Sequence, residues 1–120
     1  MASLATAYLF VVLLALAIAF VEQAFLPGFV SGNTVWGLAP GWQREIAFWN
    51  VGLGVVIAGV LWVGDPDSIR VVVTAIVVLT SLLGTHHLLA ALANRSAWLH
   101  RVGATVNYLA VVAGVIVLLR

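Results

Sequence analysis

Six side chains that could bind a ligand or transfer a proton stand out in an otherwise apolar sequence: Glu22, Glu45, Asn50, His87, His100 and Asn107. Carboxylates and imidazoles exchange protons, and amides form hydrogen bonds to a ligand or to a neighbouring helix. Removing such groups from water is costly, so within apolar runs they usually face protein or water and have a role. We therefore take these six residues as the candidate ligand-binding site.

The composition of the remaining chain indicates the class of protein. Hydrophobic residues make up 64% of the 120 residues and charged residues 8%, which is more apolar than a soluble domain of this size requires. Five basic residues against four acidic ones give a net charge of +1, so we expect no nucleic-acid partner. The chain has no cysteine, which excludes disulfides, thiolate metal ligands and cysteine nucleophiles.

The apolar runs predict four helices, at about residues 4–25, 41–63, 69–91 and 98–119, each long enough to cross a hydrocarbon layer of about 30 Å. We expect the first to be a retained helix rather than a signal peptide. No Lys or Arg precedes it, and it exceeds the usual signal core of about 7–15 residues. Residues 1–120 are thus predicted to be one transmembrane domain, an all-α, integral membrane four-helix bundle in contact with the lipid bilayer.

Residues 26–40 are predicted to form a loop, because Pro, Gly and Asn residues that end helices recur in this segment. The segment carries no charge but several large apolar side chains. We therefore expect it to lie at the membrane interface as a cap over the helices, with Trp36 among the interfacial aromatic residues.

Small residues predict the helix faces at which neighbours approach closely. The second helix has one such stripe, formed by Ala47, Asn50, Gly54 and Ala58. It has a second, nearly opposite stripe, formed by Glu45, Gly52 and Gly59. The fourth helix has a stripe formed by His100, Gly103, Asn107, Ala110 and Gly114. A helix with two such faces is expected to touch two neighbours.

The two adjacent histidines of the third helix must point in different directions, because successive helical residues differ by about 100°. His87 shares a face with Thr80, Gly84 and Ala91. His87 is therefore the better candidate for the interior, although the sequence leaves open which of His86 and His87 faces inward.

Alternating crossings place the loops after the first and third helices on the same side of the membrane. The two glutamates and the histidines then gather near that side, while Asn50 and Asn107 lie about 12–14 Å deep at ~1.5 Å per residue. We expect a polar vestibule that opens to one side and is closed below by the two asparagines.

Each of these residues also has a purely structural interpretation. The two asparagines could simply hydrogen-bond between helices. Glu45 could pair with an arginine or favour the start of its helix through the macrodipole. His87 could be a packing residue. The sequence leaves these alternatives open.

Motifs for catalysis or metal binding are missing from the sequence. There is no nucleophile elbow, phosphate loop or zincin motif, so we do not expect an enzyme. No Glu-x-x-His or His-x-x-x-His pair occurs on one helix, so no metal site is expected. A haem held by two histidines would need His87 and His100 from two different helices, which leaves a haem or a quinone as an open alternative cofactor.

The start of the second helix resembles a family of small bacterial membrane proteins, domain-of-unknown-function family 6790, which is similar in appearance to DoxX-like four-helix proteins. Its Gln-x-Glu-Val-Gly-x-x-Asn-Leu pattern is matched by Gln43, Glu45, Ile46, Ala47, Asn50, Val51, Gly54 and Val55. A Gly-His element of the family is similar to the segment Gly84 to His87, but here Gly84 is not adjacent to a histidine. The resemblance implies a four-helix fold in a bacterial inner membrane and no agreed activity.

Three functional hypotheses follow. The first is a binding or accessory subunit of a homo-oligomer or of a larger membrane complex. The second is a proton- or small-solute-coupled carrier in which Glu45 and His87 titrate inside the vestibule. The third is a quinone- or haem-associated redox subunit that uses His87 or His100.

Overall fold

A computed structural model describes residues 2–120, which form five α-helices joined by short connections. The helices are α1 (Ala2–Phe25), α2 (Pro27–Gly32), α3 (Pro40–Val63), α4 (Pro66–Ala93) and α5 (Trp98–Leu118). No strand occurs in this part of the chain, and the prediction of an all-α fold is confirmed. All helices except the short α2 are long and apolar enough to cross a membrane, judged by length and composition.

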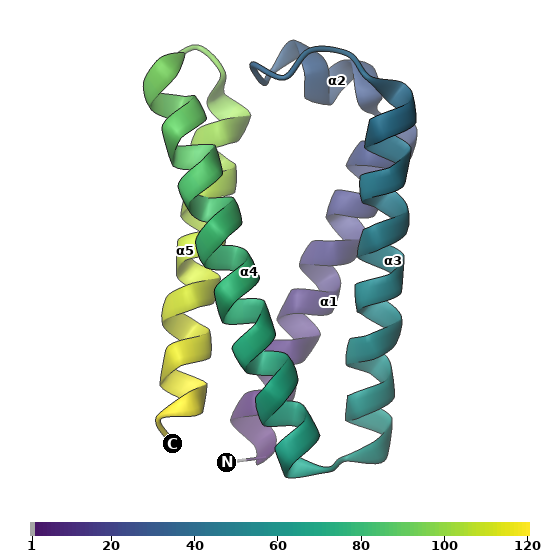
Figure 1. The fold of residues 1–120 in the computed structure, drawn as a ribbon, viewed down its shortest axis with the longest axis vertical. Coiled ribbons are helices and arrows are strands. Elements are labelled where there is room, and N and C mark those ends of the chain that lie inside the picture. The colour runs from purple at the N-terminus through teal and green to yellow at the C-terminus, as the bar shows by residue number, and fades with distance from the viewer. Residues whose placement is uncertain (1) are drawn as a thin grey trace.

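The four long helices form two antiparallel pairs, α1 with α3 and α4 with α5. Figure 1 shows that the pairs meet near the two chain termini and diverge toward the opposite end, where α2 lies. We call these the terminal end and the α2 end of the molecule. The two ends hold the helices together by different means.

An apolar core joins the two pairs at the terminal end. It consists of buried side chains from α1, α3 and α4, namely Tyr8, Leu9, Val12, Ile57, Val73 and Ile76, with Val117 and Leu118 of α5 packed against them. Leu9, Ile57 and Val73 are completely buried. In water, the burial of such apolar side chains is the main force that holds helices together. In lipid, close van der Waals packing holds them together instead. Away from this core most large apolar side chains stay exposed.

The segment 26–40 differs from its prediction as a loop, because part of it is helical. Pro27 stands at the first turn of α2, where its fixed φ favours a helix and its missing N–H costs nothing. The Gln43 side-chain amide of α3 donates a hydrogen bond to the Pro27 carbonyl at 3.3 Å. The short helix is thus tied to the start of α3.

The turn between α3 and α4 is built from a glycine and a capping aspartate. Gly64 ends α3 with φ 71°, a left-handed conformation that favours glycine. The Asp65 carboxylate accepts hydrogen bonds from the Ser68 hydroxyl and from the Ser68 backbone N–H, and these bonds hold the Asp65 pKa below its usual value. Because of this cap, α4 begins at Pro66 rather than near Ile69.

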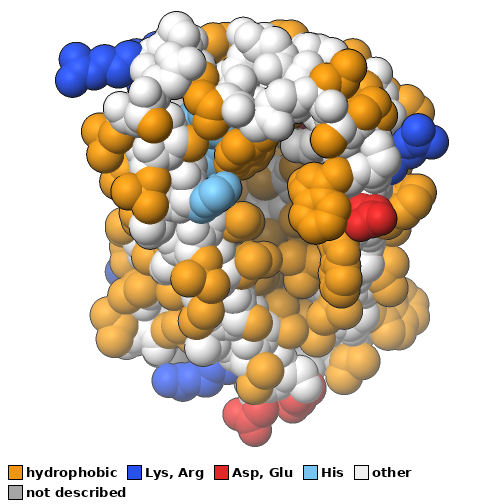
Figure 2. Space-filling model, turned by 45° about the horizontal axis from the view of Figure 1, so that its top comes forward, with side chains coloured by type: hydrophobic (Ala, Val, Ile, Leu, Met, Phe, Trp, Pro, Cys, Tyr) orange, Lys and Arg blue, Asp and Glu red, His pale blue; other side chains and the backbone are white. Residues whose placement is uncertain are grey.

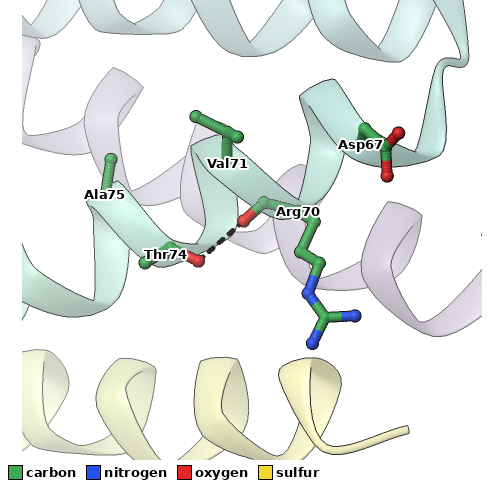
Figure 3. A pocket seen from close by; sticks show the side chains of 5 residues that line it. All are labelled: Asp67, Arg70, Val71, Thr74 and Ala75. Atoms are coloured by element: carbon green, nitrogen blue, oxygen red, sulfur yellow. Dashed lines mark hydrogen bonds between the residues drawn. The ribbon is translucent and has the colours of Figure 1, made fainter.

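Arg70 connects the first turns of α4 to the end of α5. Its guanidinium donates a hydrogen bond to the Leu118 carbonyl at 3.4 Å, and the last carbonyls of a helix lack donors of their own. Figure 3 shows the side chain leaving α4 toward the end of α5, beside Asp67 and Thr74. The basic group also lies where the α5 dipole is negative.

Candidate functional site

Three histidines and a tryptophan meet at the α2 end. The Trp36 ring stacks on His86, with centroids 5.1 Å apart and planes 17° apart. The same ring lies 5.0 Å from the His87 ring and 4.5 Å from the His100 ring. We call these four residues the Trp36 cluster. Because Trp36 precedes α3 while the histidines belong to α4 and α5, the cluster links the two helix pairs.

A chain of hydrogen bonds runs through two of the histidines. The Val35 backbone N–H donates to His100 Nε2 at 3.0 Å, and the Nδ1 atoms of His100 and His87 are 3.1 Å apart. Since Nε2 of His100 accepts, neutral His100 carries its proton on Nδ1 and donates it toward His87. Neutral His87 then accepts at Nδ1 and carries its own proton on Nε2. The Val35 bond thereby assigns the tautomer of both rings.

The position of the His87 ring depends on a glycine of α5. His100 is completely buried, while His87 is half-buried between α4 and α5. A methyl group added at Gly103 would lie 2.7 Å from His87 Nδ1, which is closer than real contacts allow. Glycine at position 103 therefore leaves the space that the imidazole occupies.

A second link joins α2 to the start of α5. The Trp98 indole N–H donates to the Asn33 side-chain oxygen at 2.6 Å, and the Asn33 amide donates to the Phe29 carbonyl at 2.8 Å. The Phe29 and Trp98 rings meet edge to face with centroids 6.3 Å apart. The segment before α3 is thus held against the second helix pair at two places.

Three of the six predicted site residues lie together between α4 and α5: His87, His100 and Asn107. The Asn107 amide donates to the Gly103 carbonyl of its own helix at 2.8 Å, rather than across to another helix. Its Cβ would lie 3.2 Å from a methyl group at Gly84, so Asn107 packs closely against α4. Its bond within α5 is a local one and does not tie the helices together.

The other three predicted residues are not brought to the histidines. Glu45 is exposed on α3 and lines a surface groove with Phe48, Trp49 and Gly52. Asn50 is half-buried on the face of α3 that carries the buried Ala47 and Ile57, and Glu22 is half-buried in the last turn of α1. Within residues 2–120, no hydrogen bond, ion pair or ring contact joins these three to a histidine. The structure therefore places the six candidate residues on four separate helix surfaces.

The sequence pattern alone did not single out several residues of the site. Trp36 was expected as an interfacial residue, but it packs on the histidines. The Val35 backbone N–H has no side-chain signature at all. Only Gly103 carried a signal, as a small residue one turn from His100.

The histidine geometry disagrees with a haem held between His87 and His100. Their Nδ1 atoms face each other directly, and Nε2 of His100 accepts from Val35. Both ring nitrogens of His100 are thus used within the chain, so His100 has no free nitrogen for an iron. In the described part of the chain, no group of three His, Cys, Asp or Glu residues is placed to hold a metal ion.

The described chain is all-α, and four of its helices could cross a membrane. No family model, no curated protein and no solved structure matches the chain. The resemblance to domain-of-unknown-function family 6790 therefore stays a prediction.

Proposed function

We propose that the protein is an integral membrane protein whose four long helices span the bilayer, and that it serves as a binding or accessory subunit of a membrane assembly. The four spans supply the length and hydropathy that crossing requires. Figure 2 shows a face covered mostly by hydrophobic side chains, with acidic and basic side chains near its two ends. This distribution matches a protein surrounded by lipid between two aqueous boundaries.

The main observation that supports a role as a subunit is an exposed carboxylate on one face of α3. Glu45 lies five residues after the start of α3, about 7.5 Å along the helix at ~1.5 Å per residue. Ionisable side chains inside membrane spans almost always face protein or a water-filled cavity. Glu45 instead faces outward beside Trp49, which is 78% exposed. A partner that covers this face would remove the carboxylate from lipid.

The same face leaves room for a partner helix. A methyl group added at Gly52 or at Gly59 would meet nothing within 4 Å, and small residues let helix backbones approach closely in membranes. We call Glu45, Trp49, Gly52 and Gly59 the Glu45 face. Its carboxylate, aromatic ring and open glycines together resemble one side of a helix interface.

The arrangement of the histidines supports this role over the other two hypotheses. In a carrier, Glu45 and His87 would share one compartment, but Glu45 lies outside the Trp36 cluster. In a redox subunit with a haem held by both histidines, each ring would offer a free nitrogen to the iron, but His100 has both of its ring nitrogens engaged. The cluster instead joins the two helix pairs.

Extraction from the native membrane tests the proposed function. A tagged chain, solubilised in mild detergent, should be released in an assembly of fixed stoichiometry that native mass spectrometry resolves. Trp49→Ala should lower the assembled fraction. Trp62→Ala should not, since Trp62, which is 91% exposed, lies about 100° around the axis from Glu45 and at the opposite end of the same helix. Release of single chains alone would contradict the proposal.

A further inference from the structure

We infer that the Glu45 face binds a second copy of this chain, and that Glu45 of one copy pairs with Arg101 of the next. The inference rests on the proposed function, because it names the partner of the same face. Three observations support the inference. The two opposite charges have no partner among the residues described, they lie at similar distances from the α2 end, and they belong to different helix pairs.

Glu45 and Arg101 are both exposed. Neither side chain has a hydrogen-bonding or charged partner among the residues described. An unpaired charge is costly to hold within an apolar layer. A contact that joins the two offsets much of this cost, since carboxylate and guanidinium form strong, charge-assisted hydrogen bonds.

The two charges lie at similar depths. Both α3 and α5 begin at the α2 end (Figure 1). Glu45 follows the start of α3 by five residues and Arg101 follows the start of α5 by three. These positions correspond to about 7.5 Å and about 4.5 Å along the respective helices. The difference of about 3 Å is within the reach of a long arginine side chain, so two copies side by side in one membrane bring the groups together.

The other arginines fit this contact less well. Arg70 and Arg120 lie at the terminal end, and Arg95 lies in the turn between α4 and α5. Arg44 is on α3 itself, so its use would require two α3 helices to face each other. That arrangement would place Glu45 of one copy beside Glu45 of the other, and like charges repel.

The contact is heterologous, because its two sides come from different helices. Figure 1 shows α3 and α5 on opposite sides of the molecule, and Figure 2 shows basic side chains at both sides of the α2 end, with an acidic side chain at one of them. The Glu45 face of one copy then meets the α5 face of the next. Repetition of such a contact gives a closed ring when the rotation between copies closes.

Site-directed crosslinking tests the geometry of this contact. The natural chain has no cysteine, so introduced thiols are the only ones present. The double variant Phe48→Cys with Thr105→Cys keeps both charges and places one thiol beside Glu45 and the other one turn after Arg101; treated in membranes with a short bis-maleimide, it should give a ladder of dimers and larger species. Each single variant should stay monomeric under the same treatment. Dimers from Phe48→Cys alone would show an α3 to α3 contact and overturn the inference.

Charge reversal tests the pairing itself. In lipid nanodiscs, Glu45→Arg or Arg101→Glu should weaken self-association by at least about thirtyfold, on the scale of desolvated charge pairs at interfaces. The double reversal should restore association, whereas Arg95→Glu should leave it unchanged. Thermal unfolding of each variant checks that the monomer still folds. Association that survives both single reversals would overturn the pairing.

A third test asks whether a helix of the second copy packs closely against the Glu45 face. Gly52→Leu should block association, whereas Ala75→Leu should not, because Ala75 lies exposed on α4 in a separate groove (Figure 3). A natural chain that is monomeric in nanodiscs but bound at fixed stoichiometry to a different protein would overturn this inference and leave the proposed function standing. A chain that is monomeric and without any partner would overturn both.

Discussion

The Nδ1 atoms of His87 and His100 lie 3.1 Å apart, and only one of them can supply the proton between them. Val35 occupies Nε2 of His100 with its backbone N–H, so His100 is the donor and His87 the acceptor. The two imidazoles thus extend a backbone hydrogen bond from the segment before α3 into the interface of α4 and α5. This order of donors makes the two rings chemically distinct.

The first prediction concerns these tautomers. In the neutral protein, His100 should carry its proton on Nδ1 and His87 on Nε2. Nitrogen-15 NMR of histidine-labelled protein distinguishes the two forms, with single His→Gln variants assigning the signals. His86 serves as the internal reference, because it is exposed and stacks on Trp36. Finding the Nε2–H form in both rings would show that the Val35 bond is absent.

The second prediction concerns the space for His87. Gly103→Ala places a methyl group against the imidazole, so we expect the ring to move and the contact with His100 to break. The cost should be about 1–3 kcal/mol of unfolding free energy, as for other overpacked sites. Denaturant unfolding in detergent measures it. Gly54→Ala is the control, since its methyl group would meet Leu13 at an ordinary 3.8 Å. Equal stability of the two variants would contradict the packing of His87 on Gly103.

The third prediction separates two glycines that share the same sequence signature. A methyl group at Gly114 would lie 2.9 Å from the Tyr8 hydroxyl and would also overlap Val77, whereas one at Gly54 would meet Leu13 at an ordinary 3.8 Å. Gly114→Ala should therefore lower the unfolding free energy by about 1–3 kcal/mol.

The matched variant Gly54→Ala should be neutral or slightly stabilising, because alanine favours a helix over glycine by about 0.5–1 kcal/mol. Thermal unfolding of both variants in the same detergent makes the comparison. A loss at Gly54 as large as at Gly114 would show that the α1 to α3 contact is tighter than 3.8 Å implies.

The fourth prediction concerns pH and the cap of α4. The Asp65 pKa is lowered in the folded protein by hydrogen bonds from Ser68, so the ionised carboxylate favours folding. This contribution is present above the unfolded pKa of about 3.9 and is lost as the pH falls through the lower, folded value. The stability gap between the natural chain and Asp65→Ala should therefore close on acidification. A gap that stays constant down to pH 2 would contradict the cap.

Local patterns predicted the long helices because hydropathy and helix-ending residues act within a few turns. The Asp65 cap extended α4 by about one turn, and Pro27 started a helix inside the expected loop. Both effects depend on individual hydrogen bonds or on one fixed dihedral angle. Average composition does not record such details.

The candidate site was harder to predict, because helix ends on one side of a membrane need not share a compartment. Glu45 and His87 were expected together from their depth, but their faces point to different surroundings. Trp36 lies in a loop, and a loop has no sequence periodicity from which its contact with the histidines could be predicted. Asn107 found its acceptor one turn away in its own helix, a choice that sequence spacing leaves open.

The uneven connection of the two helix pairs has a mechanical consequence. The apolar core holds them together near the termini, and the segment before α3 ties them at the far end of a molecule 41 Å long. A rotation of one helix pair relative to the other by a few degrees about the core therefore produces a larger displacement at the α2 end. The Val35 to His100 and Asn33 to Trp98 bonds lie where the leverage is greatest, so two hydrogen bonds there restrain the opening more effectively than they would beside the core.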